Sequence, residues 1–567
     1  MARGGWGLCA VVFLTAVFAC AVYAASAAAE TEAAPAAPAP TENAAVCPPG
    51  TQVGVAPSQP AIESTGAITL SVAQAILMAL ENNKALVVQR YNPSIQYNNI
   101  AVQRAAFDPT LTGDLRFSRT HSFFPTIDQK TGNLVRSTGS SQATTAQIGI
   151  SEFLPTGTTL ALVGTSKLNP LESIETSEYS TRVGLTVTQS LLRGFGLDVN
   201  LASLRQARIA YLASEFELRG FAESLLAATE ETYWNYALAQ KQIDIFEQSL
   251  KIAEDQMNET KERIRVGQLA ESELAAAAAE VALRKQNLIN ARAALATTRV
   301  QLLRLISPQS SVPLGLDVAS SDEPCIPTDQ IDGLDEHLAL GLRMRPDLNQ
   351  ARLQVNRGDL QIVKTKNGLL PRLDLFATFG KTGLSDSYWG SIKHIDDGGY
   401  DLVAGLTGDY TLGNRAAKAD YSSSVLSRDE SLEAVANLAQ SVESDIRLAF
   451  IEVGRSGEQV TASAATTKLQ EETLRAETEK FRVGRSTNLL VIQAQRDLLQ
   501  ARITEIQSVI NYIKSFTELY RLEGSLLTRR GIQCAGGEPV TMTSGFDAAA
   551  APGNACTTGA QAVVPAQ

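Results

Sequence analysis

The sequence has few of the residues that enzymes and metalloproteins use. Only three histidines occur in 567 residues, at His121, His337 and His394, and the six cysteines form no CxxC pair. Zinc sites need several such ligands at short, regular spacing, so we expect no metal site. The chain also lacks a P-loop, an HExxH motif and a GxSxG turn. We therefore expect no enzyme activity and no cofactor.

Basic charge and long apolar runs are also scarce. Lysine and arginine number 49 against 60 aspartates and glutamates, which gives a net charge of −11. Nucleic-acid binding relies on basic residues that replace counterions, so no nucleic-acid partner is expected. Beyond the first thirty residues, no apolar run reaches the length of roughly 20 residues that a transmembrane helix needs.

The first 27 residues predict a signal peptide. Arg3 precedes an apolar stretch over residues 8–23, and residues 25–27 read Ala-Ser-Ala, which suits signal peptidase. The alternative is lipidation at Cys20, in a segment that loosely resembles a lipobox, although Phe18 is bulky for that motif. An exported chain without a spanning helix is periplasmic, secreted, or a β-barrel in an outer membrane.

Low-complexity segments flank the central part of the chain. Residues 28–65 form an Ala/Pro-rich linker, and residues 526–567 are expected to form a flexible C-terminal tail. Neither composition buries enough apolar surface to offset the entropy of ordering. In an oxidising compartment four cysteines can pair in three ways or stay unpaired, and the sequence does not choose. These cysteines are Cys47, Cys325, Cys534 and Cys556.

Two motifs at a fixed separation indicate an internal duplication. Arg265-Val266-Gly267 and Arg482-Val483-Gly484 lie 217 residues apart, and at the same offset Arg304 falls on Arg521. Several matches at one offset predict a first repeat over 66–306, an inter-repeat linker over 307–336 and a second repeat over 337–525.

The first repeat is longer than the second in one place. Pro109 pairs with Pro371 at an offset of 262, so the first repeat holds 45 extra residues, within 121–180. This stretch contains a further predicted hairpin near 145–165. We expect that hairpin to elaborate an external loop; the alternative is that it adds strands to the sheet.

Each repeat changes its hydrophobic period. Apolar Leu111, Leu115 and Phe117 alternate with polar Thr112 and Asp114, which is typical of strands with one dry face and one wet face. A soluble sandwich and a membrane barrel both produce this pattern. Strands are predicted within 110–192 and 372–413. Helices are predicted over 70–106, 197–264, 271–306, 337–367, 416–480 and 487–523.

The two longest helices predict coiled-coil hairpins. Apolar residues of 197–264 recur at steps of three and four, and about 65 helical residues extend roughly 100 Å. The hairpin tips fall near 265–269 and 482–486, where glycine suits a tight turn. Val266 and Val483 would be exposed there, and an exposed apolar side chain at a repeated position suggests docking.

The order of these elements resembles the TolC-like outer membrane efflux family, the outer membrane factors. The resemblance covers roughly 70–525, and the duplicated series of elements carries it. The segments that match are SVAQAILMALENNKAL, TQSLLRGFG, the two RVG turns, LLRLI, LGLRMRPDL, VIQAQRDLLQA and LYRLEG.

This resemblance implies an α+β membrane protein that forms a homotrimeric channel. Each subunit would give four strands to a shared 12-stranded transmembrane β-barrel and its helices to a long periplasmic α-helical barrel, with an equatorial belt near 307–336. It implies a location in the cell outer membrane of a Gram-negative-type bacterium, extending into the periplasm. It also implies a tripartite efflux or type I secretion system with a periplasmic adaptor and an inner-membrane pump. By residue match, the adaptor would dock on Arg265, Val266, Gly267, Arg482, Val483 and Gly484.

One departure from the family concerns the periplasmic constriction. Family members often carry acidic rings after the second Val-Gly turn, but here Leu489, Leu490 and Gln493 occupy the segment and the first acid is Asp497. An apolar constriction can gate by dewetting. The alternative is that these leucines pack against a neighbouring helix.

A physical argument also favours several copies. Four strands cannot close a barrel, and an open sheet edge in lipid leaves backbone groups unpaired at several kcal/mol each. The rival function is a non-conducting periplasmic scaffold or adaptor-like protein whose strands form a soluble sandwich. The sequence does not identify the cargo, the pump or the adaptor.

Overall fold

The computed structural model describes residues 68–127, 132–171, 176–306, 317–324, 333–532 and 540. The predicted signal peptide, the linker over 28–65 and all six cysteines lie outside these residues, so the expectations about them stay predictions. Among the described helices, none is both long enough and apolar enough to cross a membrane.

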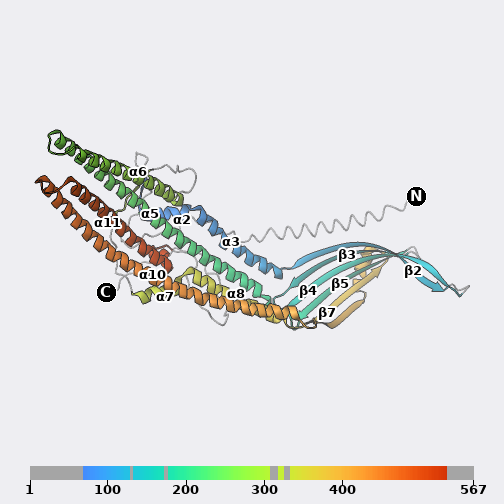
Figure 1. Cartoon of the computed structure of the whole chain (residues 1–567). Coiled ribbons are helices and arrows are strands. Elements are labelled where there is room, and N and C mark those ends of the chain that lie inside the picture. Colours follow the sequence, from blue (N-terminus) through green and yellow to red (C-terminus); the bar gives the residue numbers. More distant parts are fainter. Residues whose placement is uncertain are drawn as a thin grey trace, which may run out of the picture. The chain divides into compact units, whose positions relative to one another are not determined.

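A single antiparallel sheet contains six strands in chain order (Figure 1). They are β2 (Thr110–Ile127), β3 (Leu134–Phe153), β4 (Thr158–Leu171), β5 (Thr176–Ser190), β7 (Arg372–Ser385) and β8 (Tyr400–Asp409). We expected four strands and an external loop near 145–165. Both expectations are wrong, because β3 and β4 pair with each other and with β2 and β5 as inner strands of the sheet.

One face of the sheet carries a continuous apolar row. The strand register aligns one large apolar residue from every strand, and each of these side chains is exposed in the single chain. At the neighbouring positions the opposite face is mostly small or polar, with Val163 and Val403 as exceptions, which largely follows two-residue alternation. The row consists of Leu111, Ile150, Leu162, Leu185, Phe379 and Leu402.

The predicted long helices are present. They are α5 (Ala202–Arg265), α6 (Ser272–Ile306), α10 (Arg415–Arg482) and α11 (Asn488–Leu522), with α4 (Leu197–Asn200) just before α5. At 1.5 Å per residue, the 64 residues of α5 span roughly 96 Å. Helix α5 packs against α6, and α10 packs against α11, so each pair forms a helical hairpin.

The two other predicted helices are each divided in two. Residues 70–106 form α2 (Val72–Asn82) and α3 (Lys84–Arg104), and residues 337–367 form α7 (Leu334–Met344) and α8 (Pro346–Gly368). At Asn83 the side-chain oxygen accepts hydrogen bonds from the amides of Ala85 and Leu86, which starts α3. Pro346 starts α8, where its fixed φ suits the first helical position.

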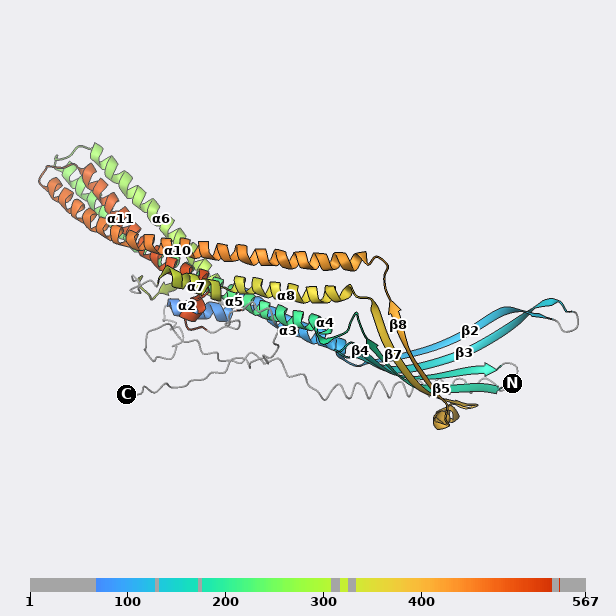
Figure 2. The same cartoon turned by 90° about the horizontal axis from the view of Figure 1, so that it is seen from below.

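Each long helix packs along two shorter ones. Helix α5 contacts α3 near the sheet and α6 further away, and α10 contacts α8 and α11 in the same way (Figures 1 and 2). Because α5 also packs against α8 and α11, the helices form one layer. Its lateral order is α3 or α6, then α5, then α8 or α11, and finally α10.

The middle of the chain holds the largest apolar core. Strand β1 (Ile68–Leu70) pairs in parallel with β6 (Val318–Ser320), so part of the expected equatorial linker is held on the core. Tyr233 donates a 2.9 Å hydrogen bond to the Leu70 carbonyl from a fully buried position. Leu302 and Leu303 of α6 pack there too.

The start of the C-terminal segment is ordered, contrary to our expectation of a flexible tail from residue 526. Helix α12 (Leu526–Arg529) follows α11, and both Leu526 and Leu527 are buried. At Val540 the backbone N–H donates to Asn349 of α8. The composition argument failed here because two leucines are enough to anchor a short segment on an existing core.

Candidate functional site

The two hairpin tips have the same backbone geometry. At the first tip, the amide of Gly267 donates to the Ile264 carbonyl and the amide of Gln268 to the Arg263 carbonyl. Gly267 has φ +78°. These paired bonds are a Schellman motif, which ends a helix with a residue in the left-handed region, so glycine is favoured there.

The second tip repeats this arrangement residue for residue. The amide of Gly484 donates to the Phe481 carbonyl and that of Arg485 to the Lys480 carbonyl, and Gly484 has φ +74°. A Cβ at Gly267 or Gly484 would meet no atom within 4 Å. Backbone conformation, and not crowding, therefore explains both glycines.

The side chains predicted to dock are exposed at both tips. Val266 is 59% and Val483 is 68% exposed. Arg265 pairs with Glu262 at 2.8 Å, and Arg482 pairs with Glu479 at 3.0 Å. Each tip thus presents one apolar side chain next to an exposed ion pair, which leaves the valine as the apolar feature available to a partner.

Contacts between the hairpins hold the two tips side by side. The Arg263 guanidinium lies 4.8 Å from the centre of the Phe481 ring, a cation–π distance. Further from the tips, Arg496 of α11 donates a 2.9 Å hydrogen bond to Glu280 of α6. The carboxylate of Glu280 is buried, so this link belongs to the packing of the hairpins and not to their surface.

The residues predicted to form a constriction lie together on an exposed face of α11. Leu489 is 58% and Leu490 is 45% exposed, and Gln493 is exposed as well. Between them Val491 and Ile492 are buried. Among the described residues, Leu489 and Leu490 are therefore only partly covered by their own chain, and whether they face a pore or a second copy stays a prediction.

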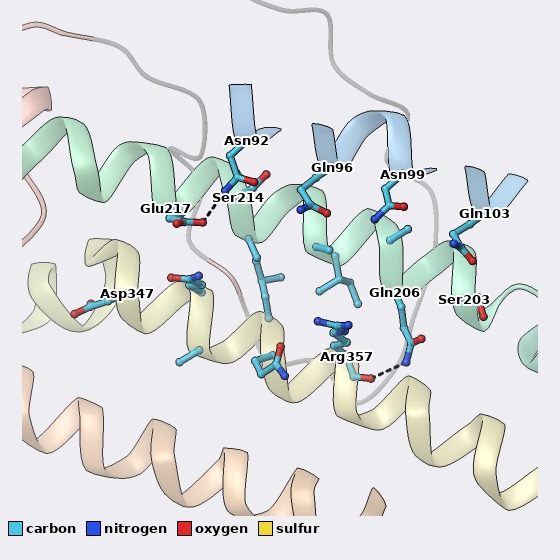
Figure 3. A pocket seen from close by; sticks show the side chains of 18 residues that line it. Asn92, Gln96, Asn99, Gln103, Ser203, Gln206, Ser214, Glu217, Asp347 and Arg357 are labelled. Carbon is cyan, nitrogen blue, oxygen red and sulfur yellow. Dashed lines mark hydrogen bonds between the residues drawn. The ribbon is translucent and has the colours of Figure 1, made fainter. Parts of the chain in front are cut away.

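A polar groove lies over α5, between α3 and α8 (Figure 3). It has a volume of about 770 Å³ and its walls are rich in neutral amides, including Gln96, Asn99 and Gln354. Asn92 donates to Glu217 across the groove at 2.9 Å.

The edges of the helical layer carry exposed apolar stripes that our sequence reasoning missed. Four residues of α3 recur at steps of three, four and seven, and four residues of α10 fall on one side of that helix at 3.6 residues per turn. All eight are about 60% exposed or more in the single chain. They are Val88, Tyr91, Ile95 and Val102 on α3, and Leu426, Leu448, Ile451 and Leu469 on α10.

Each edge of the helical layer continues into an edge of the sheet. Helix α3 leads into β2, and β8 leads into α10. Strands β2 and β8 are the two end strands, each paired on one side only among the described residues. The spacing of the α3 residues could have revealed its stripe, but only the packing shows that α3 and α10 are edge helices.

The described residues contain no group of three or more His, Cys, Asp or Glu side chains placed to hold a metal ion. A buried polar cluster instead joins helices. Glu523 lies 2.5 Å from the His337 ring, and Arg529 donates to the same carboxylate. These groups connect α7, α11 and α12 at the end of the second hairpin.

The chain thus combines a layer of very long helices with an antiparallel sheet that has two open edges. This arrangement is that of a membrane channel subunit of the TolC type. The outer membrane efflux protein profile matches residues 75–307 and 339–525. The chain belongs to this family, and it is an efflux channel of the outer membrane that extends into the periplasm.

Individual relatives are distant in sequence. The chain is 25% identical over 370 residues to the probable efflux pump outer membrane protein TtgC of Pseudomonas putida, covering 62% of this chain and 70% of TtgC. It is 21% identical to the outer membrane efflux protein BepC of Brucella suis, covering 83% and 90%. The solved CmeC outer membrane channel of Campylobacter jejuni has a TM-score of 0.58 at 16% identity, covering 87% and 96%.

Proposed function

We propose that the protein is the passive exit duct of a tripartite efflux or type I secretion system, and that three copies close around one pore. A periplasmic adaptor would bind the hairpin tips, and an inner-membrane pump would supply the energy. The observation that carries this proposal is that the open edges of the helical layer and of the sheet lie on the same two sides of the chain.

Both kinds of edge favour closure by further copies. An unpaired strand edge in lipid costs several kcal/mol for each unsatisfied backbone group, and joining β8 of one copy to β2 of the next removes both edges. The same step would bring α10 against α3 of the next copy near the sheet, at the level of Leu426, and against α6 of that copy further away, at the level of Leu469. Burying those side chains contributes about 25 cal/mol per Å² of apolar surface.

The internal duplication supports the docking role of the tips. Two repeats that end in the same Schellman turn, each with one exposed valine, present the same feature twice in each copy. In three copies this makes a ring of six similar tips, which suits an adaptor that also binds as a ring. We propose Arg265, Val266, Gly267, Arg482, Val483 and Gly484 as its contacts.

The docking proposal is tested at the second tip. We expect Val483→Glu, alone and together with Gly484→Arg, to weaken adaptor binding by roughly 30-fold, the loss of about 2 kcal/mol typical of an interface hot spot. Export should fall while the amount of assembled channel stays unchanged. Pull-down of the adaptor, a drug-efflux assay and native gels measure these quantities.

The single Val483→Glu variant keeps the glycine turn intact, so a loss of binding cannot be attributed to a broken hairpin. Lys468→Glu, an exposed change on α10 away from the tip, is the matched control and should bind the adaptor normally. Unchanged adaptor binding and export in both tip variants would reject the docking role.

Leu489, Leu490 and Gln493 are proposed to line the constriction at the periplasmic end of the pore. Their support is that α11 turns both leucines away from the packing of its own chain. Three copies would bring six leucines around one axis, and an apolar ring of this kind resists the passage of water and ions.

A further inference from the structure

The first repeat holds two strands that have no counterpart in the second. Four strands join directly to the helical layer: β2 after α3, β5 before α5, β7 after α8 and β8 before α10. Strands β3 and β4 join no helix and form a hairpin between β2 and β5. An inserted pair keeps the up-and-down alternation of the sheet, so the four other strands retain their directions.

The turn of this hairpin is fixed to the junction between the sheet and α5. The amide of Ser190, at the end of β5, donates to the Gly157 carbonyl at 3.1 Å. The Asn200 side chain donates to the carbonyls of Pro155 and Gly194 at 3.0 and 2.9 Å. A Cβ at Gly157 would lie 2.2 Å from the Gly194 oxygen, so the two turns are in close contact.

This attachment determines which end of the hairpin is at the junction. Residues 154–157 lie at the helical end of the sheet, and β3 and β4 run from there alongside their neighbours. An external loop would instead be attached at the far end of the sheet and could fold away from it. The hairpin therefore spans the same height as β5 and begins at the same level.

The side chains of the hairpin follow the two-faced pattern of the strands around it. Ile150 and Leu162 continue the apolar row between Leu111 and Leu185, and they are 50% and 49% exposed. On the other face, Gly149 lies opposite Thr112 of β2, and Thr165 lies between Gln147 of β3 and Arg182 of β5. A strand with an apolar face toward lipid and a polar face toward water is a barrel-wall strand.

We propose that β3 and β4 are part of the transmembrane wall, so that three copies close an 18-stranded barrel and not a 12-stranded one. This rests on the proposed assembly of three copies with six strands each. Barrel diameter grows roughly in proportion to strand number, so the outer exit would be about 1.5 times as wide as a 12-stranded exit.

The inserted hairpin does not change the number of helices in the helical layer. Each copy still contributes four helices across its layer, because β3 and β4 add no helix. The duct is therefore wider at the outer exit than in the helical tunnel, and the tunnel alone sets the upper size of the cargo. This wide exit suits bulky solutes or chains that leave the tunnel without being held in the barrel.

Cysteine pairs on the apolar row test the strand order directly in the membrane. In a background without native cysteines, we expect rapid cross-linking by a short bifunctional thiol reagent for Leu111→Cys with Ile150→Cys, and for Leu162→Cys with Leu185→Cys. Leu111→Cys with Leu185→Cys should not react, because three strand spacings separate them by roughly 14 Å. Phe379→Cys with Leu402→Cys is the positive control, since β7 and β8 are neighbours in either barrel.

The opposite result overturns the proposal. If the hairpin lay outside the wall, β2 and β5 would be neighbours, so the Leu111–Leu185 pair would cross-link and the first two pairs would not. These bonds form within one chain, so the outcome does not depend on the number of copies. Native mass spectrometry measures that number separately, and a count other than three would reject the assembly without affecting the strand order.

The width of the exit is tested by polymer exclusion in planar bilayers. Polyethylene glycols added on the barrel side should reduce the single-channel conductance up to a larger polymer size than those added on the side of the helical tips. Equal size limits from the two sides would overturn the wide exit.

Discussion

The two longest helices each form the first half of a helical hairpin, but they differ in burial. Helix α5 has 64 residues, 21 of them buried, whereas α10 has 68 residues and only nine buried. Helix α5 has neighbours on both sides within the chain, while α10 has them on one side. The difference shows that α10 is an edge helix of the single chain, and we propose that its second neighbour belongs to another copy.

The two helices also differ in the charged side chains that they bury. Arg219, Glu223 and Glu230 of α5 are all buried, and each has an ion-pair partner. The buried residues of α10 are apolar or hydroxyl-bearing, and its exposed surface carries Leu426, Leu448, Ile451 and Leu469 among charged residues. An inner helix can hold charges that are paired within the chain, whereas an edge helix needs a surface that another copy can cover.

The largest effect is expected from disrupting the proposed contact between copies at α10. Leu448→Lys with Ile451→Lys would place two charges at the proposed contact between copies, where burying an unpaired charge is very costly. We expect the assembled channel to fall tenfold or more on native gels, while circular dichroism of the chain stays unchanged. Thr461→Lys, exposed on another face of α10, is the control. Normal assembly of the double variant would show that α10 is not an interface.

The two hairpins also differ in the residues that follow their tips. At the offset of 217 residues, Leu489 and Leu490 of the second hairpin correspond to Ser272 and Glu273 of the first. We expect Leu489→Ser with Leu490→Glu, which gives the second hairpin the polar pair of the first, to increase the resting conductance several-fold. Bilayer recordings without pump or adaptor measure it.

The same variant separates the two interpretations of the leucines. If they pack against a neighbouring helix, the exchange lowers the amount of assembled channel and leaves the conductance of each remaining channel unchanged. Ser272→Leu with Glu273→Leu in the first hairpin is the matched control, because it adds apolar side chains away from the proposed constriction. We expect that control to leave the resting conductance as it is.

Much of the helical part was predictable from sequence, because hydrophobic period and length are local properties. The tips followed from Gly267 and Gly484, and α2 begins after Ser71, whose side chain accepts from the Gln74 amide. The strand count was not predictable. Alternation marks Ile150 and Leu162 as strand residues, but it does not tell which strands pair, and the shorter second repeat suggested a loop.

Contacts between residues far apart in the chain explain the remaining differences between the sequence-based predictions and the structure. Leu526 and Leu527 lie in a segment of unremarkable composition, yet they are buried on a core built from distant helices. Likewise, the edge position of α10 depends on which helices flank it. The sequence carries the apolar stripe, but it does not say whether that stripe faces a helix of the same chain or of another copy.

The smallest expected effect concerns a buried acid on α5. Glu223 is 2% exposed and lies 3.3 Å from Arg219. Burial raises its pKa to about 7, although Arg219 acts in the opposite direction. An acid whose pKa is raised in the folded state binds more protons there than when unfolded, so stability falls as pH rises from about 4.5 to about 7.

We expect Glu223→Gln to remove this dependence of the unfolding free energy on pH, because the amide keeps the shape of the side chain and stays neutral at every pH. The unfolding free energy of the detergent-solubilised protein at pH 5 and pH 8 measures it. Glu217→Gln, an exposed change on the same helix that bonds Asn92 in the native chain, is the control and should keep the slope. An equal pH dependence in Glu223→Gln and the native protein would mean that Glu223 stays ionised in the fold, with Arg219 outweighing its burial. The inner helix would then hold a permanent ion pair.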